Sequence, residues 1–190
     1  MSSVIRKATL NDIEQIYDLY KAVTKHNPGN LTQEDYEVTI DYVEEMVKTS
    51  FERGLILVID RDGEIIGFFK AFTSKFKCLA HILGDGTIMI HPDYQQGHGF
   101  KLAIYALNTI SKTMSHIMQF DIVPHESNQL AIKLYQKLNF KYQFNNKDKI
   151  RNYDGSFGGE VLMSWKNDNF CSNALNKYHE YLKQKYFVKS

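Results

Sequence analysis

The spacing of apolar residues alternates along the chain between the period of a helix and that of a strand. Residues 3–6 read as a short strand, and Thr9 followed by Asp12 has the spacing of a helix-capping box. Apolar side chains then recur every three or four residues through 13–23 and again through 33–50, which predicts two amphipathic helices. The expected buried positions are Ile13, Ile16, Tyr17, Tyr20 and Val23, then Tyr36, Ile40, Val43 and Val47.

The next segment has the pattern of a β-hairpin. Residues 55–59 are apolar and largely β-branched, and Asp62-Gly63 is a strong two-residue turn signal before a second strand over 64–72. The remaining elements are expected as a strand at 87–90, a helix at 100–114, a strand at 118–123, a helix capped by Ser127-Asn128, two strands around a turn at 154–159, and a helix at 173–188. This order predicts an α/β fold with a mixed, twisted sheet and helices on both faces.

Length and composition fit one globular domain with an extension. Of the 190 residues, 43% are hydrophobic and 24% charged, and 23 basic against 22 acidic side chains give a formal net charge of +1. This balance gives no sign of a nucleic-acid or membrane partner. Cys78 and Cys171 form no paired motif, the N-terminus lacks an apolar signal-peptide core, and no apolar run reaches the roughly 20 residues that span a bilayer. We therefore expect a cytoplasmic protein.

The segment 88–102 has the pattern of an anion-binding loop. A strand is followed by two closely spaced glycines, Gly97 and Gly99, and then by the start of a helix, whose first backbone N–H groups are unpaired and favour negative charge. Glycine also lets the backbone approach a phosphate closely. The segment lacks the P-loop signature, and Leu102 stands where a dinucleotide fingerprint requires a third glycine. By itself this pattern is equally typical of a plain tight turn.

A second segment, 127–140, decides between these readings. Together the two segments resemble the GNAT superfamily of acyl-CoA-dependent N-acetyltransferases. The first is similar to the family's pyrophosphate motif, Gln/Arg-x-x-Gly-x-Gly/Ala after a strand and a proline. The second is similar to its Asn-x-x-Ala-x-x-Leu-Tyr-x-Lys-x-Gly-Phe helix, with Asn128 and Tyr135 at the motif positions. The resemblance covers about residues 3–166, which implies a GNAT domain at 1–166 and a helical extension at 167–190 that packs on the domain or on a partner subunit.

The sequence departs from the family pattern at two places. The motif's Gln/Arg position falls on Tyr94, one residue before the glutamine that looks intended, Gln95, so the loop is one residue shorter than usual. The set of amides that contacts a pyrophosphate is therefore left open. Asn139 replaces the glycine before Phe140, a mild change because asparagine also tolerates left-handed backbone geometry.

The resemblance implies acetyl-CoA as co-substrate and a set of residues that contact it. The strand that ends at Ile90 is expected to splay from the strand 118–123, with the pantetheine arm in the gap, paired to backbone groups of Ile88 and Ile90. Asn128 is expected to contact the arm, to cap its helix, or both. The implied contacts are Ile88, Met89, Ile90, Gln95, Gln96, Gly97, His98, Gly99, Phe100, Lys101, Asn128 and Tyr135.

The implied reaction transfers an acetyl group from a thioester to a primary amine by direct attack in a ternary complex. The backbone amide around Met89 is expected to stabilise the oxyanion. Tyr135 is expected to protonate the leaving thiolate or donate a hydrogen bond to its sulfur, although its place on the apolar stripe also fits a purely structural role. The base is open among Asp85, which reads more readily as a turn residue, His81, and water.

Several alternatives remain at the level of sequence. The seven histidines lack metal-ligand spacing, so no metal is expected. The acceptor is a small-molecule amine or peptide, with Tyr17, Tyr20, Tyr36 and Asn27 near its pocket by resemblance. A homodimer is one alternative for the oligomeric state. The competing functional hypothesis is a catalytically inert acyl-CoA-binding or protein-interaction module on the same fold.

Overall fold

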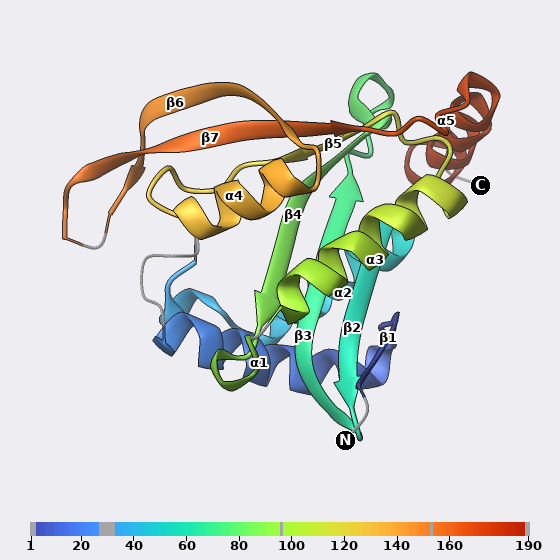
Figure 1. The fold of residues 1–190 in the computed structure, drawn as a ribbon. Coiled ribbons are helices and arrows are strands. Elements are labelled where there is room, and N and C mark those ends of the chain that lie inside the picture. Colours follow the sequence, from blue (N-terminus) through green and yellow to red (C-terminus); the bar gives the residue numbers. More distant parts are fainter. Residues whose placement is uncertain (1–2, 27–32, 96, 153, 189–190) are drawn as a thin grey trace.

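Seven strands form one mixed sheet in the computed structural model, which describes residues 3–26, 33–95, 97–152 and 154–188 (Figure 1). The strand order is β1-β2-β3-β4-β5-β7-β6, and every neighbouring pair is antiparallel except β4 and β5. The strands are β1 (Ser3–Lys7), β2 (Gly54–Arg61), β3 (Glu64–Thr73), β4 (Ile82–Ile90), β5 (Gln119–Ile122), β6 (Lys141–Arg151) and β7 (Phe157–Lys166). The helices are α1 (Ile13–His26), α2 (Ile40–Arg53), α3 (His98–Thr113), α4 (Gln129–Lys137) and α5 (Ser172–Tyr186). The predicted mixed α/β architecture is confirmed.

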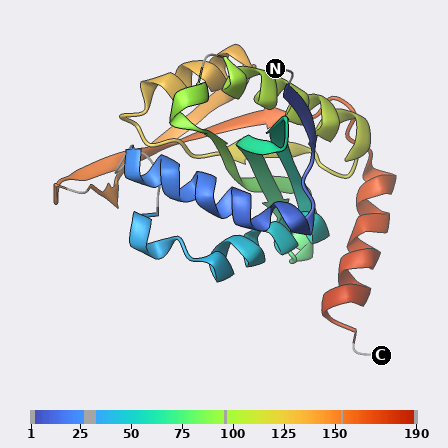
Figure 2. The same cartoon turned by 90° about the horizontal axis from the view of Figure 1, so that it is seen from below.

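The core is divided by the sheet into two apolar layers. Side chains of β2 alternate between them, with Ile56 and Val58 packed toward α1 and α2 and Leu55 and Leu57 toward α3. In Figure 2 α1 and α2 lie on one face of the sheet, and α3 and α4 on the other. Helices therefore cover both faces, as the pattern predicted.

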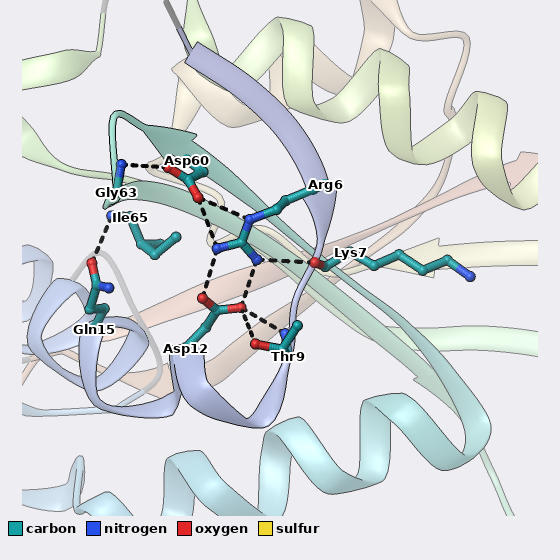
Figure 3. Close-up of polar contacts among 8 residues, drawn as sticks. All are labelled: Arg6, Lys7, Thr9, Asp12, Gln15, Asp60, Gly63 and Ile65. Carbon is teal, nitrogen blue, oxygen red and sulfur yellow. Dashed lines mark hydrogen bonds and ion pairs between the residues drawn. The ribbon is translucent and has the colours of Figure 1, made fainter.

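The N-terminal strand is tied to its surroundings by a closed network of charged groups (Figure 3). The Arg6 guanidinium donates to both Asp12 oxygens at 2.8 Å and to Asp60 on β2 at 3.0 Å. Asp12 also accepts from the Thr9 backbone N–H at 2.7 Å and from its hydroxyl at 3.0 Å, which completes the predicted capping interaction. The network joins β1, the start of α1 and the β2–β3 hairpin.

The β2–β3 hairpin forms as predicted, whereas the second helix begins later. Asp62 and Gly63 have φ angles of 53° and 93°, the left-handed geometry that a tight hairpin requires. The segment expected to be helical from residue 33 instead contains a short 3₁₀ turn, and α2 starts after Thr39, whose hydroxyl accepts from the Tyr42 N–H. Tyr36, expected to be buried, is 74% exposed because it precedes that cap.

The last helix contacts the body of the chain through its aromatic side chains. Tyr178 stacks on His116 with ring centroids 4.0 Å apart, and its hydroxyl lies 2.9 Å from that of Thr73. Tyr186 donates to the Glu52 carboxylate at 2.5 Å. Helix α5 thus contacts the rest of its own chain, while the division at residues 166 and 167 and the choice between packing on the domain and on a partner subunit stay predictions. Within the described ranges, no helix combines the length and apolarity that crossing a bilayer needs.

Candidate active site

Strands β4 and β5 pair only briefly before they separate. Their parallel register covers Ile82 opposite Gln119 and Leu83 opposite Phe120, after which β4 continues beside β3 alone (Figure 1). A Cβ atom at Gly86 would lie 2.7 Å from the Phe120 ring, so only glycine permits the strands to approach where they begin to separate. The splayed strand pair expected from the resemblance is therefore present.

The beginning of α3 faces this opening. Gly97 is the N-cap residue and has φ 82°, a left-handed conformation that favours glycine. The unpaired first N–H groups of a helix favour an anionic ligand. The predicted anion-binding loop therefore has the backbone geometry that its sequence implied.

A groove of about 660 Å³ runs from this helix start to Tyr135 on α4. Nine of the twelve predicted contact residues line it. Those nine are Ile88, Met89, Ile90, Gln95, Gly97, Gly99, Phe100, Asn128 and Tyr135. Asn128 also caps α4, accepting at 3.1 Å from the Ala131 N–H, so its structural role coexists with a position on the groove.

Two predicted contacts point elsewhere, and one lies outside the described residues. The His98 ring nitrogen Nδ1 is 2.6 Å from the Tyr94 carbonyl oxygen, and the His98 backbone N–H donates to Gln95 at 3.1 Å. The Lys101 N–H donates to the Gly97 carbonyl at 3.1 Å as part of the helix. Gln96 is the residue outside the described ranges. The amides of Gly97, Gly99 and Phe100 are thus the better placed for an anion.

The register of β4 decides which of its amides faces the groove. His91 donates its N–H to the Ile66 carbonyl at 2.9 Å, and Met89 lies opposite Phe68 in the same antiparallel ladder. Because hydrogen-bonded pairs alternate in such a ladder, the Met89 N–H is directed to β3, while those of Ile88 and Ile90 point toward the open gap. The oxyanion contact expected at Met89 is therefore better placed at Ile88.

A second cavity of about 200 Å³ adjoins the groove. Both are lined by Ile88, Asn128, Ala131 and Tyr135, so their contents would meet at these residues. The walls of the second cavity also include polar side chains from five separate elements or loops, namely Tyr20, Gln33, Lys70, Asp85, Thr87 and His125. Of the aromatic and amide residues expected near an acceptor, Tyr20 lines this cavity and Asn27 lies outside the described residues.

Lys70 and Asp85 form an ion pair in the wall of this second cavity. Lys70 Nζ lies 2.7 Å from Asp85 Oδ2, with the lysine side chain 2% and the aspartate side chain 59% exposed. Burial lowers the pKa of Lys70, and Asp85 partly opposes that shift. Asp85 was expected in a turn, but it lies inside β4 at a β-bulge, with φ 50°. The bulge, unlike a turn, keeps the strand going and re-aims the side chain.

Tyr135 stands where the two cavities meet. Its ring packs on Phe140 at 5.4 Å between centroids, and burial raises its pKa to about 12. Among the described residues its hydroxyl has no hydrogen-bond partner. Tyr135 is thus both part of the apolar face, as its helical position indicated, and directed to the candidate site.

His81, the other base considered, lies in the turn immediately before β4 and lines neither cavity. Lys70 is not among the site residues predicted from the sequence, because the run 64–72 is interpreted there only as a strand. Its signal in the sequence is a single lysine in the apolar run Ile-Ile-Gly-Phe-Phe-Lys-Ala-Phe. A charged residue within a buried strand is rare without a specific partner.

Comparison with known proteins agrees with this geometry. The model of the acetyltransferase (GNAT) family matches residues 13–140. No curated protein sequence matches the chain. Among solved structures, a GNAT acetyltransferase from Streptococcus pneumoniae is 19% identical, with a TM-score of 0.79 over 87% of this chain and 99% of that one.

Two similar structures contain the acetyl donor. yncA from Salmonella typhimurium, solved with its cofactor acetyl-CoA, is 18% identical, with a TM-score of 0.76 over 88% of this chain and 95% of its own. A phosphinothricin acetyltransferase from Sinorhizobium meliloti, in complex with acetyl-CoA, is 17% identical, with a TM-score of 0.78 over 90% and 92% of the two chains. At these identities the similarity establishes the fold.

Proposed function

Because the chain belongs to the GNAT acetyltransferase family, we propose that it transfers the acetyl group of acetyl-CoA to a primary amine of a small molecule or peptide. The observation that carries the proposal is the meeting of two cavities at Ile88 and Tyr135. One cavity begins at a helix N-terminus, and the other contains a carboxylate. Such an arrangement brings donor and acceptor together for direct attack in a ternary complex.

The groove supplies what an acyl-CoA requires. Its pyrophosphate would lie against the amides of Gly97, Gly99 and Phe100, where the helix dipole favours negative charge. The pantetheine arm would continue along the open edge of β4 and pair with backbone groups of Ile90 and with the carbonyl of Ile88, as an added strand does, which leaves the Ile88 N–H for the reacting carbonyl. The structures of yncA and of the phosphinothricin acetyltransferase, both with acetyl-CoA, support this choice of donor.

The acceptor amine must lose a proton to become a nucleophile. A free alkylamine has a pKa of about 10.4, so at neutral pH it arrives protonated. Asp85 is the carboxylate on the acceptor cavity and lies three residues before Ile88, a separation of about 10 Å along a strand. That distance exceeds one hydrogen bond, so we assign Asp85 as the proton acceptor acting through water.

The thioester carbonyl and sulfur need different partners. The Ile88 N–H at the open edge would donate to the oxyanion as the C–N bond forms. A tyrosine with a pKa of about 12 lies some 5 kcal/mol uphill of a thiol with a pKa of about 8.5 for complete proton transfer. Tyr135 therefore serves as a hydrogen-bond donor to the sulfur while the C–S bond breaks.

The first test separates an enzyme from an inert binding module. Calorimetry measures acetyl-CoA binding, and a screen of polyamines, amino acids, aminoglycosides and peptides follows CoA release. Replacing Tyr135 with Phe is expected to lower kcat roughly 10- to 100-fold and leave acetyl-CoA affinity within about threefold. No binding of acetyl-CoA to the folded protein contradicts the proposal, and binding without turnover of any amine supports the module.

A further inference from the structure

Lys70 is an unfavourable residue for the place it occupies. It is 1% exposed on β3, where its neighbours Phe69 and Ala71 are equally buried. Burial disfavours an ammonium there, as the lowered pKa of Lys70 shows. A methionine of similar volume would be easier to accommodate. Lysine at this position therefore fits a role other than stabilising the fold.

The lysine side chain is directed along the sheet toward Asp85. Its backbone lies opposite Thr87 in the β3–β4 register, yet its Nζ contacts Asp85 Oδ2 at 2.7 Å and lies 5.0 Å from the Phe72 ring centroid. Its ammonium is thus directed toward Asp85. Lys70 is among the residues that line the second cavity, but only 2% of its side chain is exposed, so Asp85 is the more accessible member of the pair.

A β-bulge in β4 places Asp85 beside Lys70. Between the Lys70–Thr87 and Phe72–Gly84 pairs, β4 has two residues where β3 has one. Asp85 is one of these two and has φ 50°, a left-handed conformation that few residues other than glycine, asparagine and aspartate adopt. The extra residue turns the aspartate toward Lys70 and toward the cavity at once.

Only one oxygen of the carboxylate is used by this contact. Oδ2 lies against Lys70 Nζ, whereas Oδ1 has no hydrogen-bond partner among the described residues. The side chain is 59% exposed to solvent, and Asp85 lines the second cavity. The cost of burying the lysine ammonium offsets much of what the attraction between the two charges contributes to stability. Its geometric effect is to fix one oxygen and leave the other available.

We propose that Lys70 is a positioning residue that holds Asp85 Oδ2 so that Oδ1 faces the acceptor amine and its water. The inference rests on the proposed function, in which Asp85 takes the proton from the nucleophile. Without Lys70 the aspartate would rotate among several conformers, and the proton acceptor would be correctly placed only part of the time. Lys70 therefore acts on catalysis through Asp85.

The kinetic test is a double-mutant cycle with Lys70→Met and Asp85→Asn. Lys70→Met is expected to lower kcat about 10- to 100-fold in the wild-type background and less than about twofold in the Asp85→Asn background. Lys70→Arg, which keeps the charge, should recover activity to within about threefold to fivefold of wild type. Affinity for acetyl-CoA should not change, because Lys70 does not line the groove.

The matched control is Lys48→Met, which removes an exposed lysine from its pair with Glu44 and should leave kcat unchanged. Equal losses from Lys70→Met in both backgrounds, or no loss in the wild type, would overturn the inference while acetyl transfer itself remained established. Absence of acetyl transfer in the wild type would instead reject the proposed function.

A second measurement needs no acceptor. The Lys70 ammonium is titrated by NMR in the wild type and in Asp85→Asn. Because the carboxylate opposes the effect of burial, its loss should lower the pKa of Lys70 further. An unchanged Lys70 titration would show that the two side chains do not interact in solution, and would overturn the inference.

Discussion

Two carboxylates, Asp12 and Asp85, each pair with a basic side chain. In the first pair the acid is the more buried partner, and in the second pair the base is. Asp12 is 7% exposed and its partner Arg6 33%, whereas Asp85 is 59% exposed and its partner Lys70 2%. Both oxygens of Asp12 accept hydrogen bonds from Arg6, and Thr9 adds two more (Figure 3). One oxygen of Asp85 accepts no hydrogen bond from the residues that the structure describes, and Asp85 lines a cavity.

This difference distinguishes a pair that stabilises the fold from one that serves chemistry. In the first, a planar guanidinium joins three segments and satisfies a buried acid completely. In the second pair, Lys70 is buried although burial disfavours its charged form. Asp85 is exposed and, among the described residues, has one carboxylate oxygen without a hydrogen-bond partner. The comparison predicts that changes at Asp12 act mainly on stability and changes at Asp85 mainly on turnover.

The largest expected effect is the loss of turnover in Asp85→Asn. Removing the proton acceptor should lower kcat by about 10²- to 10³-fold, since general base catalysis contributes factors of this order. The free energy of unfolding should fall less than in Asp12→Asn, because Asp85 is more than half exposed and the buried Lys70 can release its proton when its counter-charge is removed. Steady-state kinetics and urea unfolding check the two parts, and a variant that unfolds but keeps its specific activity would reverse the assignment.

Asp12→Asn should show the opposite behaviour. It removes the charge from a buried carboxylate with four hydrogen-bond contacts and should lower the free energy of unfolding by about 2 kcal/mol. The kcat of the folded variant should equal that of wild type, because Asp12 lines neither cavity. A large loss of kcat in fully folded protein would contradict the comparison.

The pH dependence of the stability difference between wild type and Asp12→Asn gives a second test of the role of Asp12. The hydrogen bond from Arg6 lowers the pKa of Asp12, so its folded pKa lies below the unfolded value of about 3.9. Its contribution to stability is therefore complete above about pH 4 and is lost as the pH falls through the folded pKa. Urea unfolding at several pH values should show wild type and Asp12→Asn converging in acid. A constant difference down to pH 2 would exclude Asp12 as the source.

The sequence predicted one of these two sites far better than the other. Thr9 and Asp12 are three residues apart, so the capping interaction is a local pattern in the sequence. The loop at Gly97 and the helix that contains Tyr135 likewise carry local motifs that resemble those of the GNAT family. The pairing of Lys70 with Asp85 depends on strand register and on a bulge, neither of which has a local signature. The oxyanion contact was predicted around Met89, but successive N–H groups of β4 point alternately to β3 and to the open gap. This alternation favours the Ile88 N–H, and it depends on the pairing with β3.

The smallest expected effect concerns the stability of Lys70→Met. If the lysine is retained for positioning, replacing it with an apolar residue of similar volume should leave the free energy of unfolding unchanged at pH 7 or raise it by up to about 1 kcal/mol.

Because the folded pKa of Lys70 is lowered, the wild type gains stability as the pH rises from that pKa toward the unfolded value of about 10.4. The variant lacks this gain, so its advantage should shrink in alkaline solution. Urea unfolding of both proteins, with Lys48→Met as the exposed control, measures the difference. A loss of more than about 2 kcal/mol at pH 7 would make Lys70 a stabilising residue like Arg6, and the contrast between the two pairs would then not hold.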